Sequence, residues 1–289
     1  METGTYLDAV IRSLDQFLAG PPITSGGEDL RPFLLTDRYT ALLRPEEVRG
    51  SMGTALKHRA LLLASRAAPG FLARSVAILR GTSPLPAGPR HLFVIGFPWT
   101  DSRRIRMLFP LLEALRDAAV AVSDREDVFE SLDAAGIPCL RVRVPRLLRS
   151  PRVSPEDLSP AEHRQVLRGA ALLEAAGRIL DEVRPVSVLT VQDYLPLDQA
   201  FARVARARGI HTVTHQHGQI PTGPASLYKY LFSDRMAVWG RRSARLMEQW
   251  VAPSRLWIVG TDRFDDLRSD RAPGARRHLV LGLNPVPEA

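Results

Sequence analysis

Short apolar runs alternate with amphipathic segments along the chain from residue 91 to residue 260. Each run ends in a polar or glycine-bearing turn. Continuous apolar runs of this kind are typical of strands that are buried on both faces of a parallel sheet. The runs predict strands at residues 91–96, 119–123, 138–144, 186–191, 210–215, 235–240 and 256–260.

Between these runs, apolar residues recur at every third or fourth position, which is the period of a helix that packs on one side. The expected helices cover residues 102–116, 124–136, 160–183, 197–208 and 243–250. Strands that alternate with helices predict an α/β fold, with a Rossmann-like, mostly parallel sheet and helices on both of its faces. We expect this domain to span residues 90–267.

The two ends of the chain have different patterns. Residues 1–85 predict a helical N-terminal region, with helical spacing at residues 6–18 and two further helical pieces within residues 46–79. Proline and glycine mark residues 81–89 as a linker. Residues 278–284, HLVLGLN, form a last apolar run after a basic linker. We expect residues 268–289 to be a linker and the first strand of a truncated second domain.

The chain carries 39 Lys and Arg residues against 31 Asp and Glu residues, for a formal net charge of +8. Lys57 and Lys229 are the only lysines, so nearly all of the cations are arginines. Guanidinium forks suit phosphate groups. An anionic ligand or a peripheral membrane contact fits this excess, and so does a genome that encodes basic residues as arginine. No basic block is long enough for a nucleic-acid arm, so nucleic acid is not an expected partner.

Cys139 is the only cysteine, which excludes an intramolecular disulfide and a cysteine-rich metal site. The N-terminus lacks the apolar region of a signal peptide. The most apolar long window, residues 60–79, is interrupted by Arg66, Pro69, Gly70 and Arg74, so it does not predict a membrane-spanning helix. We expect a cytoplasmic protein, with peripheral binding at the inner face of the membrane as the alternative.

Polar residues and glycines gather at the ends of neighbouring predicted strands. Right-handed crossovers bring the carboxyl ends of these strands to one edge of the sheet, where open α/β sheets bind their ligands. We therefore expect a site at this edge. Its candidate residues are Gln192, Asp193, His215, His217, Gly218 and Gly240.

His217 is the strongest candidate for chemistry among them. An imidazole titrates near neutral pH and can take a proton from a hydroxyl nucleophile, and Gly218 lets a ligand approach the backbone closely. The alternative is a histidine that only stabilises its turn, and such a structural role suits His215 better. Asp193 is the candidate to orient the imidazole or to bind a substrate hydroxyl. A cap on the helix that begins at Pro196 explains Asp193 equally well.

Two arginines are weaker candidates for binding phosphate. Arg103 opens the helix after the first strand, where a helix N-terminus favours anions, although Ser102 as an ordinary cap explains that turn. Arg263 follows the seventh strand, and pairing with Asp262 or Asp266 would also explain it.

Several well-defined cofactor and catalytic motifs are absent from the sequence. There is no G-x-G-x-x-G after the first strand and no P-loop, so neither a dinucleotide site nor an NTPase site is predicted. There is no G-x-S-x-G elbow for a serine nucleophile. His215 and His217 lack an identifiable third ligand, so a metal site is not predicted. We expect no cofactor.

An ordered set of short motifs carries a resemblance to a known class. These motifs are His217-Gly218, Asp234 before the next strand, Gly240 after it, and residues 260–265, GTDRFD. Over residues 186–267 the chain resembles GT-B-type glycosyltransferases. More narrowly, it is similar to bacterial surface-carbohydrate and capsule biosynthesis proteins, with CDP-glycerol glycerophosphotransferases as more distant relatives.

The resemblance implies two facing Rossmann-like domains, of which residues 90–267 would be the N-terminal, acceptor-binding half. It implies that His217 activates the acceptor hydroxyl and that a nucleotide sugar is the donor. The acceptor would be a bacterial surface polysaccharide or a lipid-linked glycan. The donor-binding half would be missing after residue 267. One alternative is therefore a non-catalytic acceptor-binding or scaffold subunit that needs a partner protein for the donor. The others are a glycerophosphotransferase of the CDP-glycerol type and a nucleotide-sugar epimerase of similar fold.

Overall fold

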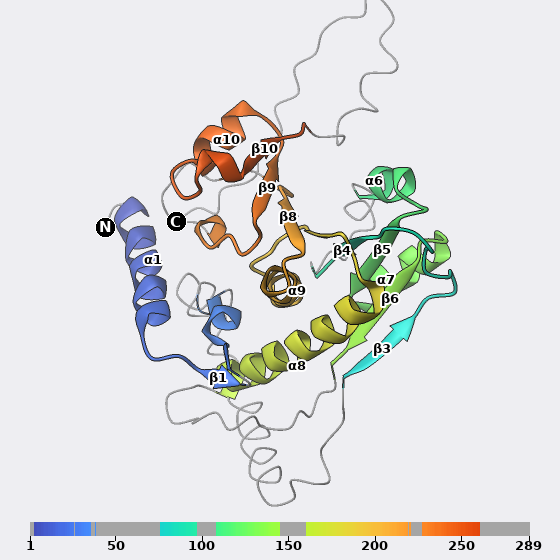
Figure 1. Cartoon of the computed structure of the whole chain (residues 1–289). Coiled ribbons are helices and arrows are strands. Elements are labelled where there is room, and N and C mark those ends of the chain that lie inside the picture. Colours follow the sequence, from blue (N-terminus) through green and yellow to red (C-terminus); the bar gives the residue numbers. More distant parts are fainter. Residues whose placement is uncertain are drawn as a thin grey trace, which may run out of the picture.

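The computed structural model describes residues 3–25, 27–35, 38, 76–96, 108–144, 160–218, 220 and 227–260. A mostly parallel sheet forms the centre of this part of the chain (Figure 1). Its strands are β3 (Ala77–Arg80), β4 (His91–Val94), β5 (Ala119–Ser123), β6 (Cys139–Arg143), β7 (Ser187–Thr190), β8 (His211–His215), β9 (Arg235–Val238) and β10 (Leu256–Ile258).

The strands of this sheet follow the order β10-β9-β8-β7-β4-β5-β6-β3. The neighbouring strands among β4 to β10 all pair in parallel, whereas β3 pairs antiparallel with β6. From β4 the chain first adds β5 and β6 on one side and then β7 to β10 on the other side. The order therefore reverses between β4 and β7, which is the switch point where doubly wound sheets bind ligands. The sheet confirms the predicted Rossmann-like fold class.

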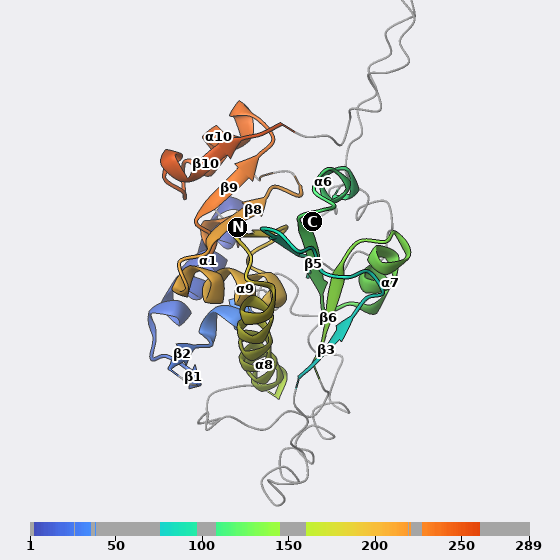
Figure 2. The same cartoon turned by 45° about the vertical axis from the view of Figure 1, so that its right-hand side comes forward.

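Helices cover both faces of the sheet, as the alternation of the apolar runs predicts. The helices α6 (Phe109–Ala114) and α7 (Glu126–Ala134) pack on one face, and α8 (Pro160–Val183) and α9 (Pro196–Ala207) pack on the other. Phe93 of β4 lies in the apolar cluster of α6 and α7, while its neighbours Leu92 and Val94 lie in the cluster of α8 and α9. Figure 2 shows α7 and α8 on opposite sides of β5 and β6.

The short helix α10 (Arg241–Met247) connects β9 to β10. Its buried residues Ala244 and Met247 pack against Met236 and Val238 of β9. Thr214 of β8 is the register partner of both Met236 and Thr190, and Thr190 is the partner of Val94. These residues share one face of the sheet, so α10 extends the layer that α8 and α9 begin.

The N-terminal region contributes to the same core. It consists of α1 (Thr3–Ala19), a hairpin of β1 (Thr24–Ser25) and β2 (Glu28–Asp29), and the single turn η1 (Arg31–Leu34). Leu30, Phe33 and Leu34 are buried in the cluster formed by α8, α9 and the sheet. A Cβ at position 169 on α8 would lie 2.5 Å from the ring of Phe33, so glycine at this position allows the close contact.

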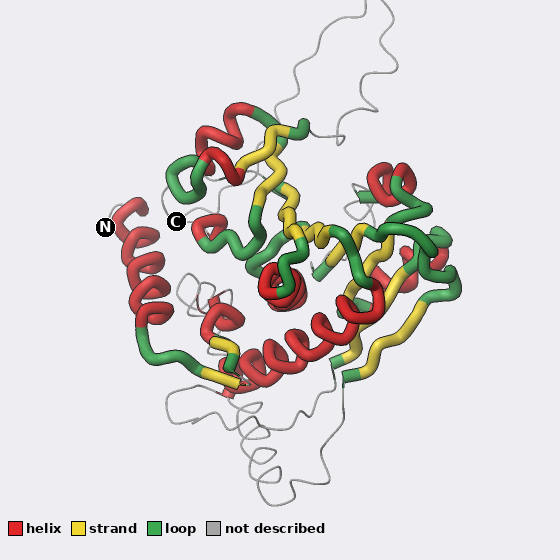
Figure 3. The backbone as a smooth tube through the Cα atoms, in the orientation of Figure 1, coloured by secondary structure: helices red, strands yellow, loops and turns green. Residues whose placement is uncertain are grey.

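One predicted element is wrong and others cannot be compared. Residues 77–79, predicted to be helical, belong to the edge strand β3, which pairs with β6 while Ile78 packs against the core. This pairing is set by a distant strand, which local helical spacing does not reveal. The predicted helices within residues 46–75 and the strand at 278–284 lie outside the described residues, as do positions 102–107 of the helix predicted at 102–116. The secondary structure of the described residues is shown in Figure 3.

None of the helices within the described ranges is both long and apolar enough to span a membrane.

Candidate functional site

The structure places the predicted site residues at one edge of the sheet. Gln192 and Asp193 follow the carboxyl end of β7, His217 follows β8, and Gly240 follows β9. Since β7, β8 and β9 are parallel neighbours, these three ends lie next to one another. The edge that the sequence predicts is therefore formed, and it adjoins the switch point between β4 and β7.

Two of the predicted residues are in direct contact, and two tyrosines complete the arrangement. The amide nitrogen Nε2 of Gln192 lies 2.7 Å from ring atom Nε2 of His217 and also donates to the hydroxyl of Tyr194. The hydroxyl of Tyr228 lies 3.3 Å from Nδ1 of His217. Gln192, Tyr194, His217 and Tyr228 form a closed ring of contacts, which we call the His217 quartet.

Aromatic packing holds the same four residues together. The rings of His217 and Tyr228 stack with centroids 5.8 Å apart at an interplanar angle of 28°. The rings of Tyr194 and Tyr228 meet edge to face, 6.1 Å apart at 88°. Both are favourable geometries for aromatic pairs. Burial raises the pKa of the Tyr228 phenol, so this hydroxyl keeps its proton.

The contacts assign a role to each ring nitrogen of His217. The Gln192 amide group donates to Nε2, so Nε2 is the nitrogen with the free electron pair. Nδ1 then carries the proton of the neutral ring and donates a hydrogen bond to the Tyr228 oxygen. A neutral imidazole held in this way is a base at Nε2. Such a base can accept a proton from a hydroxyl that replaces the Gln192 amide.

The side chain of Gln192 is held at only one of its two polar atoms. Its Nε2 makes both contacts of the quartet, whereas its Oε1 is buried without a hydrogen-bond partner in the described part of the chain. An unpaired buried acceptor is costly, at about 1–3 kcal/mol. This strain lowers the cost of moving the amide when a ligand arrives.

The turn after β8 is fixed to β9 by a neighbouring glutamine. Gln216 is 1% exposed; its Nε2 donates to the carbonyl of Gly218 at 2.8 Å, and its Oε1 accepts from the amide of Trp239 at 2.9 Å. Because Gln216 precedes His217 directly, these bonds fix the backbone that presents the imidazole. The sequence analysis did not single out Gln216.

The other predicted residues of this edge have distinct placements. His215 is the last residue of β8, half-buried, and the register puts its side chain with Ala237 on the face opposite to α9. Among the described residues, no atom lies within 4 Å of a Cβ built at Gly218. Gly240 precedes α10 in an extended conformation, with φ −173°, which any residue can adopt. The backbone therefore does not require a glycine at position 240.

Asp193 points into the protein. It is 4% exposed, and its Oδ2 accepts a hydrogen bond of 2.7 Å from the amide of Ser233. Burial raises the pKa of this carboxyl from its ordinary 3.8 to about 6, against the lowering effect of its bonds to the Ser233 segment. The ring of His217 is contacted by Gln192 and Tyr228, whereas Asp193 bonds to the Ser233 segment. Its alternative role as helix cap is wrong, because Leu195 occupies the N-cap position of α9 and no side chain caps it.

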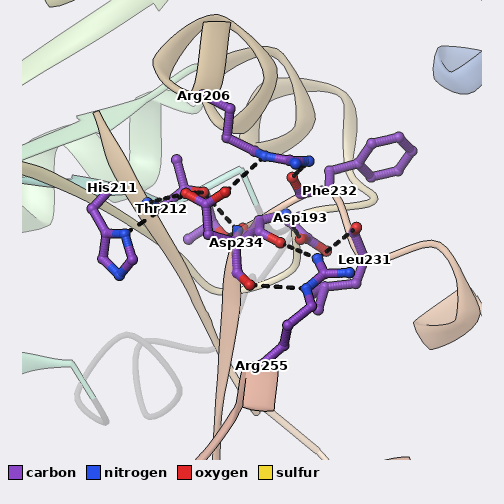
Figure 4. A network of polar contacts seen from close by, with 10 residues as sticks. Asp193, Arg206, His211, Thr212, Leu231, Phe232, Asp234 and Arg255 are labelled. Carbon is purple, nitrogen blue, oxygen red and sulfur yellow. Dashed lines mark hydrogen bonds and ion pairs between the residues drawn. The ribbon is translucent and has the colours of Figure 1, made fainter. Parts of the chain in front are cut away.

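Figure 4 shows the polar network around Asp193, which holds residues 231–234. Arg255 donates to the carbonyls of Leu231, Ser233 and Asp234. Arg206 donates to the carbonyl of Phe232 and pairs with the Asp234 carboxylate at 2.8 Å. Together these contacts fix the chain segment that runs from Tyr228 into β9.

Asp234 belongs to this network at the opposite edge of the sheet from His217. Its Oδ2 accepts from the amide of Thr212 at 3.0 Å and from the Thr212 hydroxyl at 2.8 Å. Thr212 lies at the amino end of β8, and Asp234 directly precedes β9. The aspartate that contributes to the family resemblance therefore joins two strand starts and shares the network of Asp193 rather than the contacts of His217.

A carboxylate that the sequence analysis missed lies at the switch point itself. Asp198, in the first turn of α9, is fully buried; its Oδ2 accepts from the amide of Gly96 at 3.0 Å, and its Oδ1 accepts from the amides of Val191 and Gln192 at 3.2 Å each. It thus joins the ends of β4 and β7. Burial raises the pKa of Asp198 well above its ordinary value.

The remaining predicted residues, Arg103 and Arg263, lie outside the described residues. Two other arginines stand near the same edge. Arg241 and Arg242 follow Gly240 after β9, and both are exposed. They provide positive charge at the carboxyl ends of the strands.

Comparisons with known proteins identify no relative by sequence: no family model matches the chain, and no curated protein does. Solved structures with a partly similar chain path include the UDP-N-acetylglucosamine 2-epimerase from Rickettsia bellii, with 16% identity and a TM-score of 0.40, covering 63% of this chain and 49% of that chain. MurG from Acinetobacter baumannii has 12% identity and a TM-score of 0.42, covering 60% and 46%.

A third structure is the UDP-GlcNAc 2-epimerase from Neisseria meningitidis bound to UDP-GlcNAc, with 13% identity and a TM-score of 0.40, covering 62% of this chain and 47% of that chain. The matches span less than half the length of these solved structures. At such low TM-scores, what the chain does has to be inferred from its own residues.

Proposed function

We propose that this chain is the acceptor-binding half of a GT-B-like transferase, which moves a sugar from a nucleotide donor to a bacterial surface polysaccharide or a lipid-linked acceptor. His217 is the general base. The observation that carries the proposal is the position of His217, whose ring is fixed by Gln192 and Tyr228 at the carboxyl edge of a Rossmann-like sheet. The ligand sites of such sheets lie at this edge.

The proposed reaction uses the electron pair on Nε2 of His217. The acceptor hydroxyl displaces the Gln192 amide and gives its proton to Nε2, while its oxygen attacks the anomeric carbon of the donor sugar. The bond from that carbon to the diphosphate oxygen breaks, and the nucleoside diphosphate leaves with the electron pair. Nδ1–H of His217 donates a hydrogen bond to the Tyr228 oxygen, which stabilises the imidazolium that forms.

The other residues are assigned by their places along the edge. Gln192, His215, Gly218 and Gly240 would contact the acceptor, and Asp193 would support the base from behind through Ser233. The negative charge of the leaving diphosphate needs cations or dipoles. In this proposal, the cations are Arg103, Arg263, Arg241 and Arg242.

The proposed reaction requires several partners. A nucleotide-sugar donor and a glycan or lipid-linked acceptor are required, and a partner protein would supply the donor domain if this chain does not. A lipid-linked acceptor implies peripheral contact with the inner face of the membrane. Base catalysis by His217 needs neither a metal nor an organic cofactor.

Release of nucleotide tests the proposal: a nucleoside diphosphate leaves from a nucleotide sugar, and CMP leaves from CDP-glycerol when glycerol phosphate is transferred. The purified chain is incubated with UDP-, GDP- and CDP-linked sugars and with CDP-glycerol, each with and without a bacterial cell-envelope fraction as acceptor. We expect acceptor-dependent release, and His217→Gln should lower kcat by about 10²–10⁴-fold, the usual contribution of a general base.

His211→Gln is the matched control, because His211 stands on the same strand at its opposite, exposed end. This variant should keep the wild-type rate. Equal rates for His217→Gln and wild type would rule out the base. A chain that binds the acceptor fraction yet releases no nucleotide from any donor would be an acceptor-binding subunit rather than a transferase.

A further inference from the structure

The N-terminal helix α1 packs against the segment that carries Tyr228. Figure 1 shows α1 on the side of the molecule where β8 and β9 lie. Ile11 and Leu14 of α1 are buried in one apolar cluster with Leu227, and Tyr194 and Tyr230 pack against this cluster. A helix that the sequence predicts as part of a separate N-terminal region therefore contacts the surroundings of His217.

The side chains of the turn η2 (Leu227–Lys229) point to different sides of the turn. In a 3₁₀ turn, residues three positions apart lie on the same side. Leu227 and Tyr230 accordingly share the side that faces α1, and both belong to its apolar cluster. Tyr228 lies between them in sequence and points elsewhere, where its ring stacks on His217.

A polar clamp strengthens this contact. The carboxylate of Asp15 on α1 accepts from the ammonium of Lys229 at 2.5 Å and from the hydroxyl of Tyr230 at 3.0 Å. Lys229 is one of only two lysines in the chain. The residues on either side of Tyr228, Leu227 and Lys229, are therefore both held by α1.

We propose that α1 is a structural part of the His217 site, and that Asp15 is a positioning residue which acts through η2 and Tyr228 on the ring of His217. The inference does not depend on which reaction the site performs. A partly exposed ion pair adds little stability by itself. Its effect here is geometric, because a single turn such as η2 makes few hydrogen bonds of its own to keep Tyr228 within reach of Nδ1.

The tautomer of His217 reports this positioning directly. Nuclear magnetic resonance of ¹⁵N-labelled full-length protein distinguishes a protonated from an unprotonated ring nitrogen. The chain has 7 histidines, and the spectrum of His217→Gln identifies the signals of His217 by their absence. We expect wild type to hold one tautomer, with the proton on Nδ1.

Three variants complete the experiment. Tyr228→Phe keeps the stacked ring but removes the hydroxyl, and it should change the ratio of the two tautomers by about fivefold, because one neutral hydrogen bond is lost. Asp15→Asn keeps the size of the side chain but removes its charge, and it should move the His217 signals in the same direction. Arg12→Gln is the control, since Arg12 is an exposed charged residue on the same helix.

The outcomes decide the inference. Shifts in Tyr228→Phe and Asp15→Asn, with unchanged signals in Arg12→Gln, support it. Wild-type His217 signals in Asp15→Asn would overturn it, and so would shifts of similar size and opposite sign in Asp15→Asn and Arg12→Gln, which would reflect charge alone. Since the readout is a spectrum of the free protein, failure of this inference is distinct from failure of the proposed transferase activity.

Discussion

The imidazole of His217 and the phenol of Tyr228 stack with ring centroids 5.8 Å apart, and the Tyr228 hydroxyl lies 3.3 Å from Nδ1. Both residues lie in the connection between β8 and β9, His217 near its start and Tyr228 in η2. Stacking limits the tilt of the imidazole, and the hydrogen bond selects which nitrogen carries the proton. The same tyrosine therefore fixes both the orientation and the tautomer of the proposed base.

This relationship predicts that the ring and the hydroxyl of Tyr228 contribute separately to stability. Tyr228→Phe should lower the free energy of unfolding by about 1 kcal/mol, because it removes one hydrogen bond. Tyr228→Ala should lower it by about 3–5 kcal/mol, as for other large buried aromatic residues, because the stacked ring is lost as well. Urea unfolding followed by circular dichroism measures both values. Equal losses in the two variants would mean that the ring contributes nothing.

The close approach of Gly96 to Asp198 predicts a second effect on stability. A Cβ at position 96 would lie 2.2 Å from Oδ2 of Asp198 and 3.0 Å from Cβ of Leu197. Asp198 cannot yield easily, since it is buried and bonded to three backbone amides. Gly96→Ala should therefore destabilise the protein by about 1–3 kcal/mol.

The control for this substitution is Gly88→Ala, because a Cβ at position 88 would meet no atom of the described residues within 4 Å. Its free energy of unfolding should stay within about 1 kcal/mol of wild type. Thermal unfolding of both variants in one buffer makes the comparison. A Gly96→Ala protein as stable as Gly88→Ala would show that Asp198 does not hold the switch point rigidly.

Burial of Asp193 predicts a specific pH dependence of stability. The pKa of this carboxyl rises from 3.8 in the unfolded chain to about 6 in the folded protein. Between these two values the folded state binds more protons than the unfolded state, so stability falls as pH rises. The loss attributable to Asp193 between pH 4 and pH 6 is ~2 kcal/mol.

Asp193→Asn removes this titration. We expect the variant to gain stability relative to wild type as pH increases through that window, measured by urea unfolding at pH 4, 5, 6 and 7. Asp127→Asn is a control without this trend, because the hydrogen bond from Arg125 lowers the pKa of Asp127, so its titration lies below the pH range of the experiment. A constant difference between wild type and Asp193→Asn at every pH would contradict the account of the buried carboxyl.

Apolar runs were sufficient to predict the sheet. The runs that became β4 and β5 are buried on both faces, and burial of this kind leaves an unmistakable sequence pattern. Strand β3 left no such pattern, because it is a mostly exposed edge strand whose partner β6 lies far along the chain. Residues 77–79 of β3 come at the end of a segment with helical spacing, and the prediction therefore included them in a helix.

The sequence predicted where in the fold the candidate site lies, but it predicted few of the contacts within the site. His217 and Gln192 were found because both follow apolar runs, and strand order brings such ends together. Tyr228 was missed because it belongs to a turn that returns to the site through tertiary packing. Tyr194 directly follows Asp193 at a strand end, a signal that was present in the sequence. Asp198 was missed because an aspartate in the first turn of a helix is ordinary.

The pH dependence of kcat/KM for the acceptor tests the central claim, that His217 takes the proton of the acceptor hydroxyl, most directly. Imidazoles ordinarily titrate near pH 6.5, so wild-type activity should decline on the acid side of neutrality as the base becomes protonated. Asp193→Asn removes a carboxyl that titrates near the same pH, and this variant should keep the decline. His217→Gln should retain only a low, nearly pH-independent rate. An acid decline of the same midpoint in His217→Gln and wild type would contradict the assignment of His217 as the base.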